Sequence, residues 1–556
     1  MKMIPRALVC LRQTNLPIAL LVAVLQRVPV VRLAAVGEEL TLSPPVGAIL
    51  KSAFAGTIAF GAVDTLAGAT TIVASTPSPL SVTVGTPAQT VGFGITGNGL
   101  VASAWAVLAG STIPPGMTFS AGSSGPNLTG PGTFNSTNPI LAGTPTTAGA
   151  YQILLEAWES PNQEGPESPE FVYTVNVASA MPTFTIQPSS VVINGTGGGT
   201  SVVFSAVATN TTSYQWKLNG QSVIQANASG ANTATLLISG ASSANAGNYA
   251  CVASGAAGSA TSNSATLTVT TTTDPGRLIN LSILSDIQGS LGMGFVVGGS
   301  GTGGSEPLLI RGVGPSIGPG TAFDVPGVMA DPTLAVVEQG NHTTVASNSG
   351  WGTPASNATA VATADAATGA FALSNTSSLD SAVVANLPSV GGGYSATVTG
   401  ASGDNGWALT EVYDDTASYT LAGTRLINLS CLTQIAKGGT LDVGFVIGGT
   451  TAETVLIRVG GPALNTLYGI TGVMPDPQLQ VSPLSSSTTV LAANAGWGGN
   501  PQIVSVAATV GAYTFPSPTS LDSAVVVTLP AGPYTVQVSS KSGVGGTVLV
   551  EIYEVH

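Results

Sequence analysis

The density of turn-forming residues is the feature that most constrains the fold of this chain. Its 556 residues include 71 Gly and 36 Pro. These residues divide the sequence into short runs of Val, Ile, Leu and Thr, which suit strands of about four to eight residues. The pattern therefore predicts an all-β protein.

Charge is scarce. The chain has 13 Lys+Arg and 26 Asp+Glu, so 7% of its residues are charged and its formal net charge is -13. No Lys/Arg cluster is present to neutralise a phosphate backbone, so nucleic acid is not an expected partner. At roughly 100 to 150 residues per domain, the length predicts about four domains.

The N-terminus has the features of an export signal. The basic residues Lys2, Arg6 and Arg12 precede an apolar run at 16–25, and a second apolar stretch at 46–63 precedes a small-x-small cleavage site at 67–69. We expect residues 1–69 to be removed, with retention as an anchor as the alternative. Membrane contact is expected only through this leader, and the location is predicted to be secreted or cell-surface.

Residues 77–177 contain two rigid turn motifs, Ile113-Pro-Pro-Gly-Met-Thr-Phe119 and Leu141-Ala-Gly-Thr-Pro-Thr-Thr-Ala-Gly-Ala-Tyr151. Together with the alternating strands around them, they resemble the immunoglobulin/cadherin-like modules of bacterial surface proteins. The resemblance covers about 60 residues and implies a β-sandwich.

Residues 181–270 resemble an I-set immunoglobulin domain over their whole length. Trp216 is placed as the buried tryptophan of strand C, and Tyr249, two residues before Cys251, as the tyrosine corner. Ala206 occupies the strand-B position of the partner cysteine. The resemblance therefore implies a sandwich without its inter-sheet disulfide, in which Cys251 is a buried thiol.

Beyond a short polar linker, the chain repeats itself. Residues 277–282 recur at 425–430, and 348–352 recur with one change at 494–498. The repeats define two homologous domains at 275–418 and 424–556. They resemble tandem modules of unknown function that end many exported bacterial proteins, and we expect each to form a sandwich or jelly roll. The fold class is thus predicted as a string of four β-sandwich domains after a helical hydrophobic leader.

Two motifs associated with catalysis or cofactors are poorly supported. Ser316 lies in a G-x-S-x-G match, but the second repeat reads Gly461-Pro-Ala-Leu-Asn465, and the only histidines are His342 and His556. The loop at 299–304 fits a dinucleotide fingerprint loosely and precedes a strand where a helix is required. We expect no catalysis from the first and a hairpin loop at the second.

Calcium is the ion that fits the composition, because two His and three Cys exclude nitrogen- and sulfur-ligand sites. The candidate ligands are the repeated aspartates Asp331, Asp380, Asp476 and Asp522. The alternative, which turn chemistry favours, is that these aspartates cap local backbone. No other cofactor is expected.

Each repeat also places a tryptophan in a Gly-Trp-Gly loop. Trp351 and Trp497 are the candidate ligand-binding residues, since an exposed indole can stack on a sugar while Asn348 and Asn494 bind its hydroxyls. The alternative is that each indole plugs the end of its sandwich. Arg311 and Arg458 are expected to form structural ion pairs with Glu411 and Glu551.

The leading hypothesis is a secreted or surface-attached structural and adhesion protein that acts by binding an unidentified protein or polysaccharide. The alternative is a carbohydrate-binding accessory protein that uses the loop tryptophans. A carboxylate glycoside hydrolase is a distant alternative, because it needs two carboxyls at about 5 Å or about 6.5 to 9.5 Å and no motif nominates a pair. The chain is not expected to be an enzyme.

Overall fold

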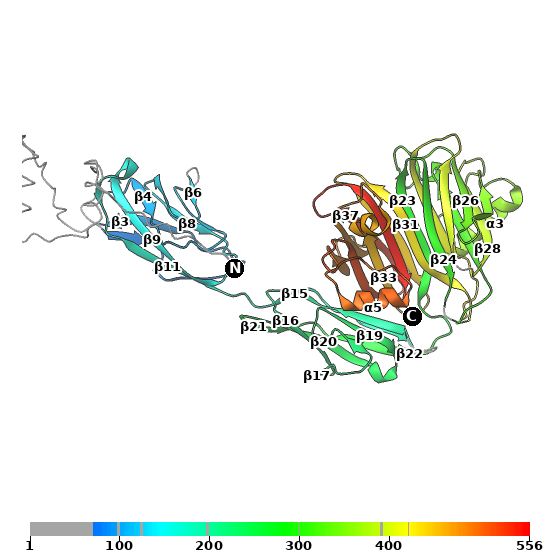
Figure 1. Cartoon of the computed structure of the whole chain (residues 1–556), viewed down its shortest axis with the longest axis horizontal. Coiled ribbons are helices and arrows are strands. Elements are labelled where there is room, and N and C mark those ends of the chain that lie inside the picture. The colour runs from blue at the N-terminus through cyan, green and yellow to red at the C-terminus, as the bar shows by residue number, and fades with distance from the viewer. Residues whose placement is uncertain are drawn as a thin grey trace, which may run out of the picture. The chain divides into compact units, whose positions relative to one another are not determined.

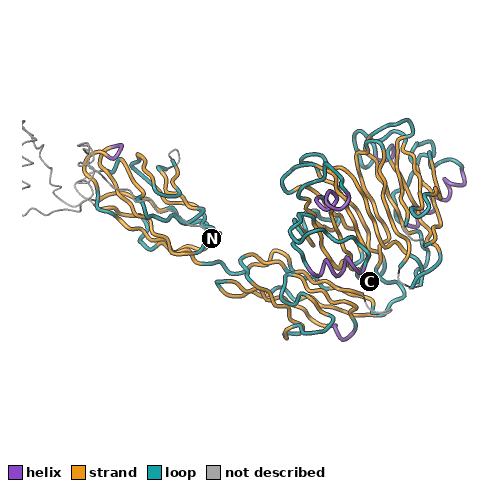
Figure 2. Tube along the Cα trace, viewed as in Figure 1, coloured by secondary structure: helices purple, strands orange, loops and turns teal. Residues whose placement is uncertain are grey.

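The computed structural model describes residues 71–96, 101–122, 126–195, 200–299, 301–389, 393–420 and 422–555. The predicted leader and its cleavage site lie outside these residues. The described chain is built almost entirely of strands, which confirms the all-β class (Figure 1, Figure 2). No helix in these ranges is both long and apolar enough to cross a membrane.

The first sandwich packs a five-stranded sheet, β1-β3-β8-β5-β6, against a six-stranded one, β2-β11-β9-β4-β7 with β10 on β9. Its core surrounds the fully buried Trp105, Phe119 and Tyr173. The elements are β1 Thr71–Ala74, β2 Leu80–Thr83, β3 Val91–Thr96, β4 Ala104–Val107, β5 Met117–Ser120, β6 Asn127–Leu128, β7 Gly132–Asn135, β8 Ile140–Gly143, β9 Gly149–Ser160, η1 Pro161–Gln163, β10 Glu164–Glu167 and β11 Phe171–Ala178.

The two rigid turns of this sandwich bind each other. The amide of Thr144 donates to the carbonyl of Gly116 at 3.0 Å, and the amide of Thr146 donates to that of Pro115 at 2.8 Å. A Cβ on Gly116, whose φ is 86°, would lie 2.1 Å from the carbonyl oxygen of Thr144. Glycine is therefore required there, because any side chain would separate the two turns.

The second sandwich has a six-stranded sheet, β13-β22-β20-β16-β17 with β21 on β20, facing the three strands β14-β19-β18, with a small β12-β15 pair beside them. Its elements are β12 Thr183–Ile186, β13 Val191–Asn194, β14 Thr200–Ser205, β15 Val207–Thr209, β16 Ser213–Leu218, β17 Gln221–Ser222, β18 Ala228–Ser229, β19 Thr235–Ala241, η2 Ser243–Asn245, β20 Gly247–Gly255, β21 Gly258–Thr261 and β22 Ala265–Thr270.

The centre of this sandwich is built around an indole. Trp216 is fully buried, lies opposite Cys251 on the neighbouring strand, and donates its Nε1 proton to the carbonyl of Thr233 at 3.0 Å. The hydroxyl of Tyr249 donates to the carbonyl of Asn245 at 2.6 Å, which is the geometry of a tyrosine corner. Cys251 is a free thiol, and burial raises its pKa to about 11, so it is chemically inert.

The C-terminal part contains sixteen strands in one connected sheet. The first repeat comprises β23 Arg277–Ile287, β24 Ser290–Gly298, β25 Ser305–Val313, η3 Pro315–Ile317, β26 Pro332–Glu338, β27 Thr343–Asn348, α3 Ala355–Thr368, β28 Ser381–Pro388, β29 Tyr394–Gly400 and β30 Gly406–Asp414. The second comprises β31 Arg425–Ile435, β32 Thr440–Gly448, β33 Glu453–Gly460, α4 Pro462–Tyr468, β34 Pro477–Pro483, β35 Ala492–Asn494, α5 Pro501–Thr509, β36 Ser523–Leu529, β37 Gly532–Ser540 and β38 Gly546–Glu554. The short helices of the repeats were not predicted.

The two repeats pair with each other through their first two strands (Figure 1). The first strand of the first repeat, β23, pairs with β32, the second strand of the other repeat. In the same way β31 pairs with β24. Both pairings are antiparallel. Because the side chains beneath these strands form one continuous hydrophobic cluster, the repeats share a large core, and each repeat also has a smaller cluster around its tryptophan.

The second sandwich forms hydrogen bonds with the second repeat. The amide of Val203 donates to the hydroxyl of Thr528 at 2.6 Å, and the hydroxyl of Thr454 donates to the carbonyl of Ser201 at 2.5 Å. The side-chain amide of Gln502, on α5, donates to the carbonyl of Ser229 at 2.8 Å. These contacts make the repeats structurally inequivalent.

Because the two repeats pair their strands with each other, we expect neither repeat to be stable without the other. Residues 275–420 expressed alone should be aggregated or dimeric, because without β31 and β32 the strands β23 and β24 lose hydrogen-bonding partners and half of their core. Light scattering coupled to size exclusion, with far-UV circular dichroism, measures this. Residues 71–178, which have their own core, serve as the control that folds as a monomer. A folded monomer of residues 275–420 would contradict the shared-core interpretation.

Candidate functional site

Asp380 organises the loops at one end of the first repeat. Its carboxylate is completely buried and accepts hydrogen bonds from the amides of Gly314 and Ser316 at 2.9 and 3.2 Å. The hydroxyls of Ser316, at 2.5 Å, and Ser378 also donate to it. Asp380 thus caps the short helix η3 from a distant part of the chain. Ser316 lies in this turn as a hydrogen-bond donor.

Asp522 makes the same contacts in the second repeat. It accepts from the amides of Gly461 and Ala463 at 2.7 and 3.1 Å, at the start of α4, and from the hydroxyl of Ser520. Because these donors occupy the oxygens of Asp380 and Asp522, the prediction that these two aspartates bind calcium is wrong. They are backbone caps.

The other repeated aspartates have separate neighbours. Asp476 accepts from the hydroxyls of Ser540 and Ser542 at 2.6 and 3.0 Å. Asp331 lies beside Asp404, and the hydrogen bond between these two carboxyls raises the pKa of Asp404. Among the described residues no group of three or more His, Cys, Asp or Glu side chains is arranged to hold a metal.

The loop tryptophans are part of the core. Trp351 and Trp497 are 2% and 6% exposed. Their Nε1 protons are donated to the carbonyls of Asn375 at 3.1 Å and Ser517 at 3.0 Å. Since neither ring has a face open to solvent, the hypothesis that these indoles stack on a sugar is wrong. Each ring plugs the end of its sandwich instead.

The loop asparagines hold the same loops in place. The Oδ1 atom of Asn348 accepts from the amides of Gly350 and Ala382 at 3.0 and 3.1 Å. In the second repeat Asn494 accepts from the amide of Ala524 at 3.2 Å. Because these oxygens bind backbone, they are not available to bind sugar hydroxyls in the way that the sequence suggested.

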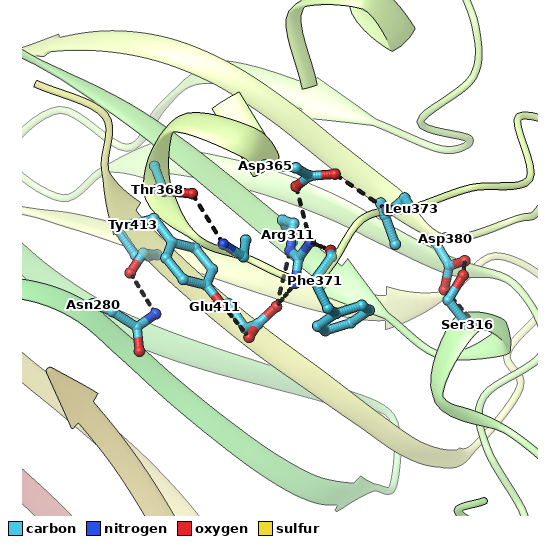
Figure 3. A network of polar contacts seen from close by, with 12 residues as sticks. Asn280, Arg311, Ser316, Asp365, Thr368, Phe371, Leu373, Asp380, Glu411 and Tyr413 are labelled. Carbon is cyan, nitrogen blue, oxygen red and sulfur yellow. Dashed lines mark hydrogen bonds and ion pairs between the residues drawn. The ribbon is translucent and has the colours of Figure 1, made fainter. Parts of the chain in front are cut away.

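A buried ionic network lies below the Asp380 loops in the first repeat (Figure 3). Arg311 is completely buried; its Nε donates to Glu411 at 2.9 Å, and one terminal nitrogen donates to Asp365 at 2.9 Å and to the carbonyl of Phe371 at 2.6 Å. The hydroxyl of Tyr413 donates to the other oxygen of Glu411 at 2.7 Å. The charge of Arg311 is thus fully compensated, as a buried guanidinium requires.

The second repeat keeps the cation without the second carboxylate. Ala507 stands where the first repeat has Asp365, at the same spacing before the capping aspartate. Arg458 is buried, its Nε lies 3.7 Å from Glu551, and its guanidinium nitrogens make no hydrogen bond to the described chain. The rings of Tyr513 and Phe515 cover it at 4.1 and 4.3 Å. Closer ring contacts accompany the missing carboxylate, since the rings over Arg311, those of Phe371 and Tyr413, lie at 4.2 and 5.4 Å.

A close carboxyl pair occurs at the other end of the first repeat. Glu306 and Asp414 are 1% and 6% exposed, and burial, followed by the hydrogen bond and charge of Asp414, raises the pKa of Glu306 to about 8. The hydroxyls of Thr416 and Thr424 donate to Glu306 at 2.9 and 3.0 Å. Since solvent does not reach the pair, it cannot act on a polysaccharide.

Unlike the buried carboxyl pair, a large groove on the first repeat is open to solvent. A groove of about 780 Å³ is bounded by β26, β29 and the loops that Asp380 and Asn348 hold. Its walls are Thr333, Leu334, Ala335, Ser347, Asn348, Ser349, Gly350, Thr353, Pro354, Thr376, Ser377, Ser378, Leu379, Thr397 and Thr399. None of these residues is charged. The sequence analysis missed this groove because its residues come from four separate segments and match no motif.

The family model described as "Immunoglobulin domain" matches residues 181–255. This segment is therefore similar to immunoglobulin domains. The match covers the buried Trp216, the Tyr249 corner and Cys251, which is consistent with the geometry of the second sandwich. No curated protein gives a significant match to the chain.

Several solved structures resemble parts of the chain. The N-terminal Ig1-2 module of the Drosophila receptor protein tyrosine phosphatase DLAR is 20% identical, covers 36% of this chain and 99% of its own, and has a TM-score of 0.15. Murine CEACAM1b is 21% identical, with 36% and 100% covered and a TM-score of 0.18. The insect immune protein hemolin is 15% identical, with 34% and 44% covered and a TM-score of 0.24. At these scores the likenesses carry no conclusion about function or arrangement.

The two arginine centres should respond differently to the same substitution. Arg311→Met strands two buried carboxylates and should lower the free energy of unfolding by about 3 to 5 kcal/mol. Arg458→Met strands only Glu551, which keeps its bond from Tyr553, and should cost about 1 to 2 kcal/mol. Urea unfolding followed by tryptophan fluorescence compares them. Equal losses would contradict the difference in their hydrogen bonding.

The Glu306 pair makes stability depend on pH. Folded Glu306 keeps its proton up to a pKa of about 8, whereas the unfolded side chain loses it near pH 4.3. Its contribution to the free energy of unfolding therefore falls as the pH rises between these values. Glu306→Gln, which mimics the protonated side chain, should match the parent near pH 4.5 and be more stable near pH 8. Urea unfolding measures the free energy of unfolding across this pH range, with the exposed Glu164→Gln as control. If the pH profile of Glu306→Gln ran parallel to that of the parent, the assignment would be refuted.

Proposed function

We propose that this chain is an exported, adhesion-type protein that acts by binding to a surface or an extracellular partner and not by turnover. The observation that carries the proposal is the placement of its reactive groups. The candidate nucleophile, the capping aspartates and the carboxyl pair are held in buried hydrogen-bond networks, whereas the open groove of the first repeat offers only uncharged groups.

Three further features support a binding role. The immunoglobulin-like domain is a sandwich that displays loops on a rigid scaffold. The acidic net charge of -13 disfavours nucleic acid and anionic membrane surfaces. The leader sequence favours delivery outside the cytoplasm.

Export and binding can be tested together with the full chain. Expressed in a secreting bacterial host, it should leave the cytoplasm and lose residues 1–69, as N-terminal sequencing of the product would show. The same chain without residues 1–69 should stay inside. The exported product should sediment with intact cells or extracellular matrix. It should hydrolyse none of a panel of glycoside substrates. Full-length protein that remains cytoplasmic, or steady glycoside turnover, would overturn the proposal.

A further inference from the structure

The groove of the first repeat differs from the corresponding surface of the second in one respect that determines its shape. Tyr394 and Tyr534 occupy equivalent places, since each stacks on the phenylalanine of a neighbouring strand of its own repeat. Counting from these tyrosines, Thr397 of the first repeat corresponds to Gln537 of the second. Pro332 and Pro477 begin equivalent strands, so Ala335 of the first repeat corresponds to Gln480 of the second.

Long side chains thus stand in the second repeat where short ones line the groove. Ala335 pairs directly with Thr397 across β26 and β29, and Gln480 pairs directly with Gln537 across β34 and β37. Gln478, which replaces Thr333, donates to Ser539 at 2.9 Å, so the glutamines also bind across these strands. The fold accepts glutamine at these positions, so the short residues of the first repeat are not required by packing.

The groove presents hydroxyls that the protein itself does not use. The side-chain hydroxyls of seven lining residues make no hydrogen bond within the described part of the chain: Ser347, Ser349, Thr353, Thr376, Ser377, Thr397 and Thr399. Each can both donate and accept. Their positions are fixed because the loops at 347–354 and 376–380 are held by Asn348, Trp351 and Asp380.

We infer that this groove binds a neutral oligosaccharide segment, an inference that rests on the proposed binding function and names its ligand class. An uncharged wall cannot compensate a desolvated phosphate or carboxylate, so anionic polymers are disfavoured. The apolar surface is limited to parts such as Pro354 and Leu379, which is 50% exposed, so lipid is disfavoured as well. Sugar hydroxyls match the donor and acceptor character of the wall, and their C–H faces can lie on these two side chains.

The volume agrees with this class of ligand. About 780 Å³ lies within the range of small-molecule sites, roughly 300 to 1,000 Å³, and the groove is open to solvent, as binding within a longer polymer requires. A protein partner would be expected to place aromatic or arginine anchors in a more apolar pocket.

The second repeat supplies the test variant. The double substitution Ala335→Gln/Thr397→Gln fills the groove with the side chains that the protein already has at the equivalent positions. The exported full chain and this variant would be titrated by calorimetry against neutral hexose oligosaccharides, uronic acid oligosaccharides and an unstructured peptide mixture. Thr343→Gln, at an exposed position of β27 outside the groove, is the matched control.

We expect the parent and Thr343→Gln to bind a neutral oligosaccharide with equal affinity, and the double variant to lose about tenfold or more at unchanged thermal stability. Binding that survives in the double variant would overturn the inference, as would binding of only uronic acids, only peptide or nothing. If the double variant is exported and adheres to cells as well as the parent, the proposed function stands and the inference about this groove is wrong. A chain that stays in the cytoplasm would fail at the proposed function itself.

Discussion

The exchange of strands between the two repeats is the constraint on which the C-terminal half depends. Each repeat gives its second strand to the first strand of the other, so the side chains of both repeats meet in one hydrophobic cluster. The core beneath these four strands is thus built from both repeats. Duplication in the sequence has therefore produced one structural unit with two similar ends, and the ends are where the copies differ.

The two repeats differ in the groups that compensate the charge of the equivalent buried arginine. Arg311 has two carboxylates and rings at 4.2 and 5.4 Å, whereas Arg458 has one carboxylate and rings at 4.1 and 4.3 Å. Tyr513 requires the neighbouring Gly460, because a Cβ there would lie 2.2 Å from its hydroxyl oxygen, and the first repeat has Val313 and Phe371 at these places. The replacements are thus coupled by packing, and each set keeps a cation buried by a different physical means.

This divergence also divides the roles of the two ends. The second repeat receives the immunoglobulin domain through Thr454, Gln502 and Thr528, and glutamines stand on the surface equivalent to the groove. The first repeat keeps short hydroxyl side chains and an open groove. Specialisation of one copy for internal contacts leaves the other free for a ligand.

The sequence by itself determined the all-β class, the repeat and the positions of Trp216, Tyr249 and Cys251, because turn spacing, alternation and a compact motif are local properties. The same local information led to the wrong role for Trp351, Trp497, Asp380 and Asp522, since a Gly-Trp-Gly loop reads the same whether its ring points outward or inward. Only the tertiary structure decided that the indoles are buried, that the aspartates cap distant helices, and that hydroxyls from four segments form one groove. Those outcomes depend on contacts between separate segments, such as the Asp380 and Asp522 caps, whose partners lie 66 and 61 positions away, and no local pattern encodes such contacts.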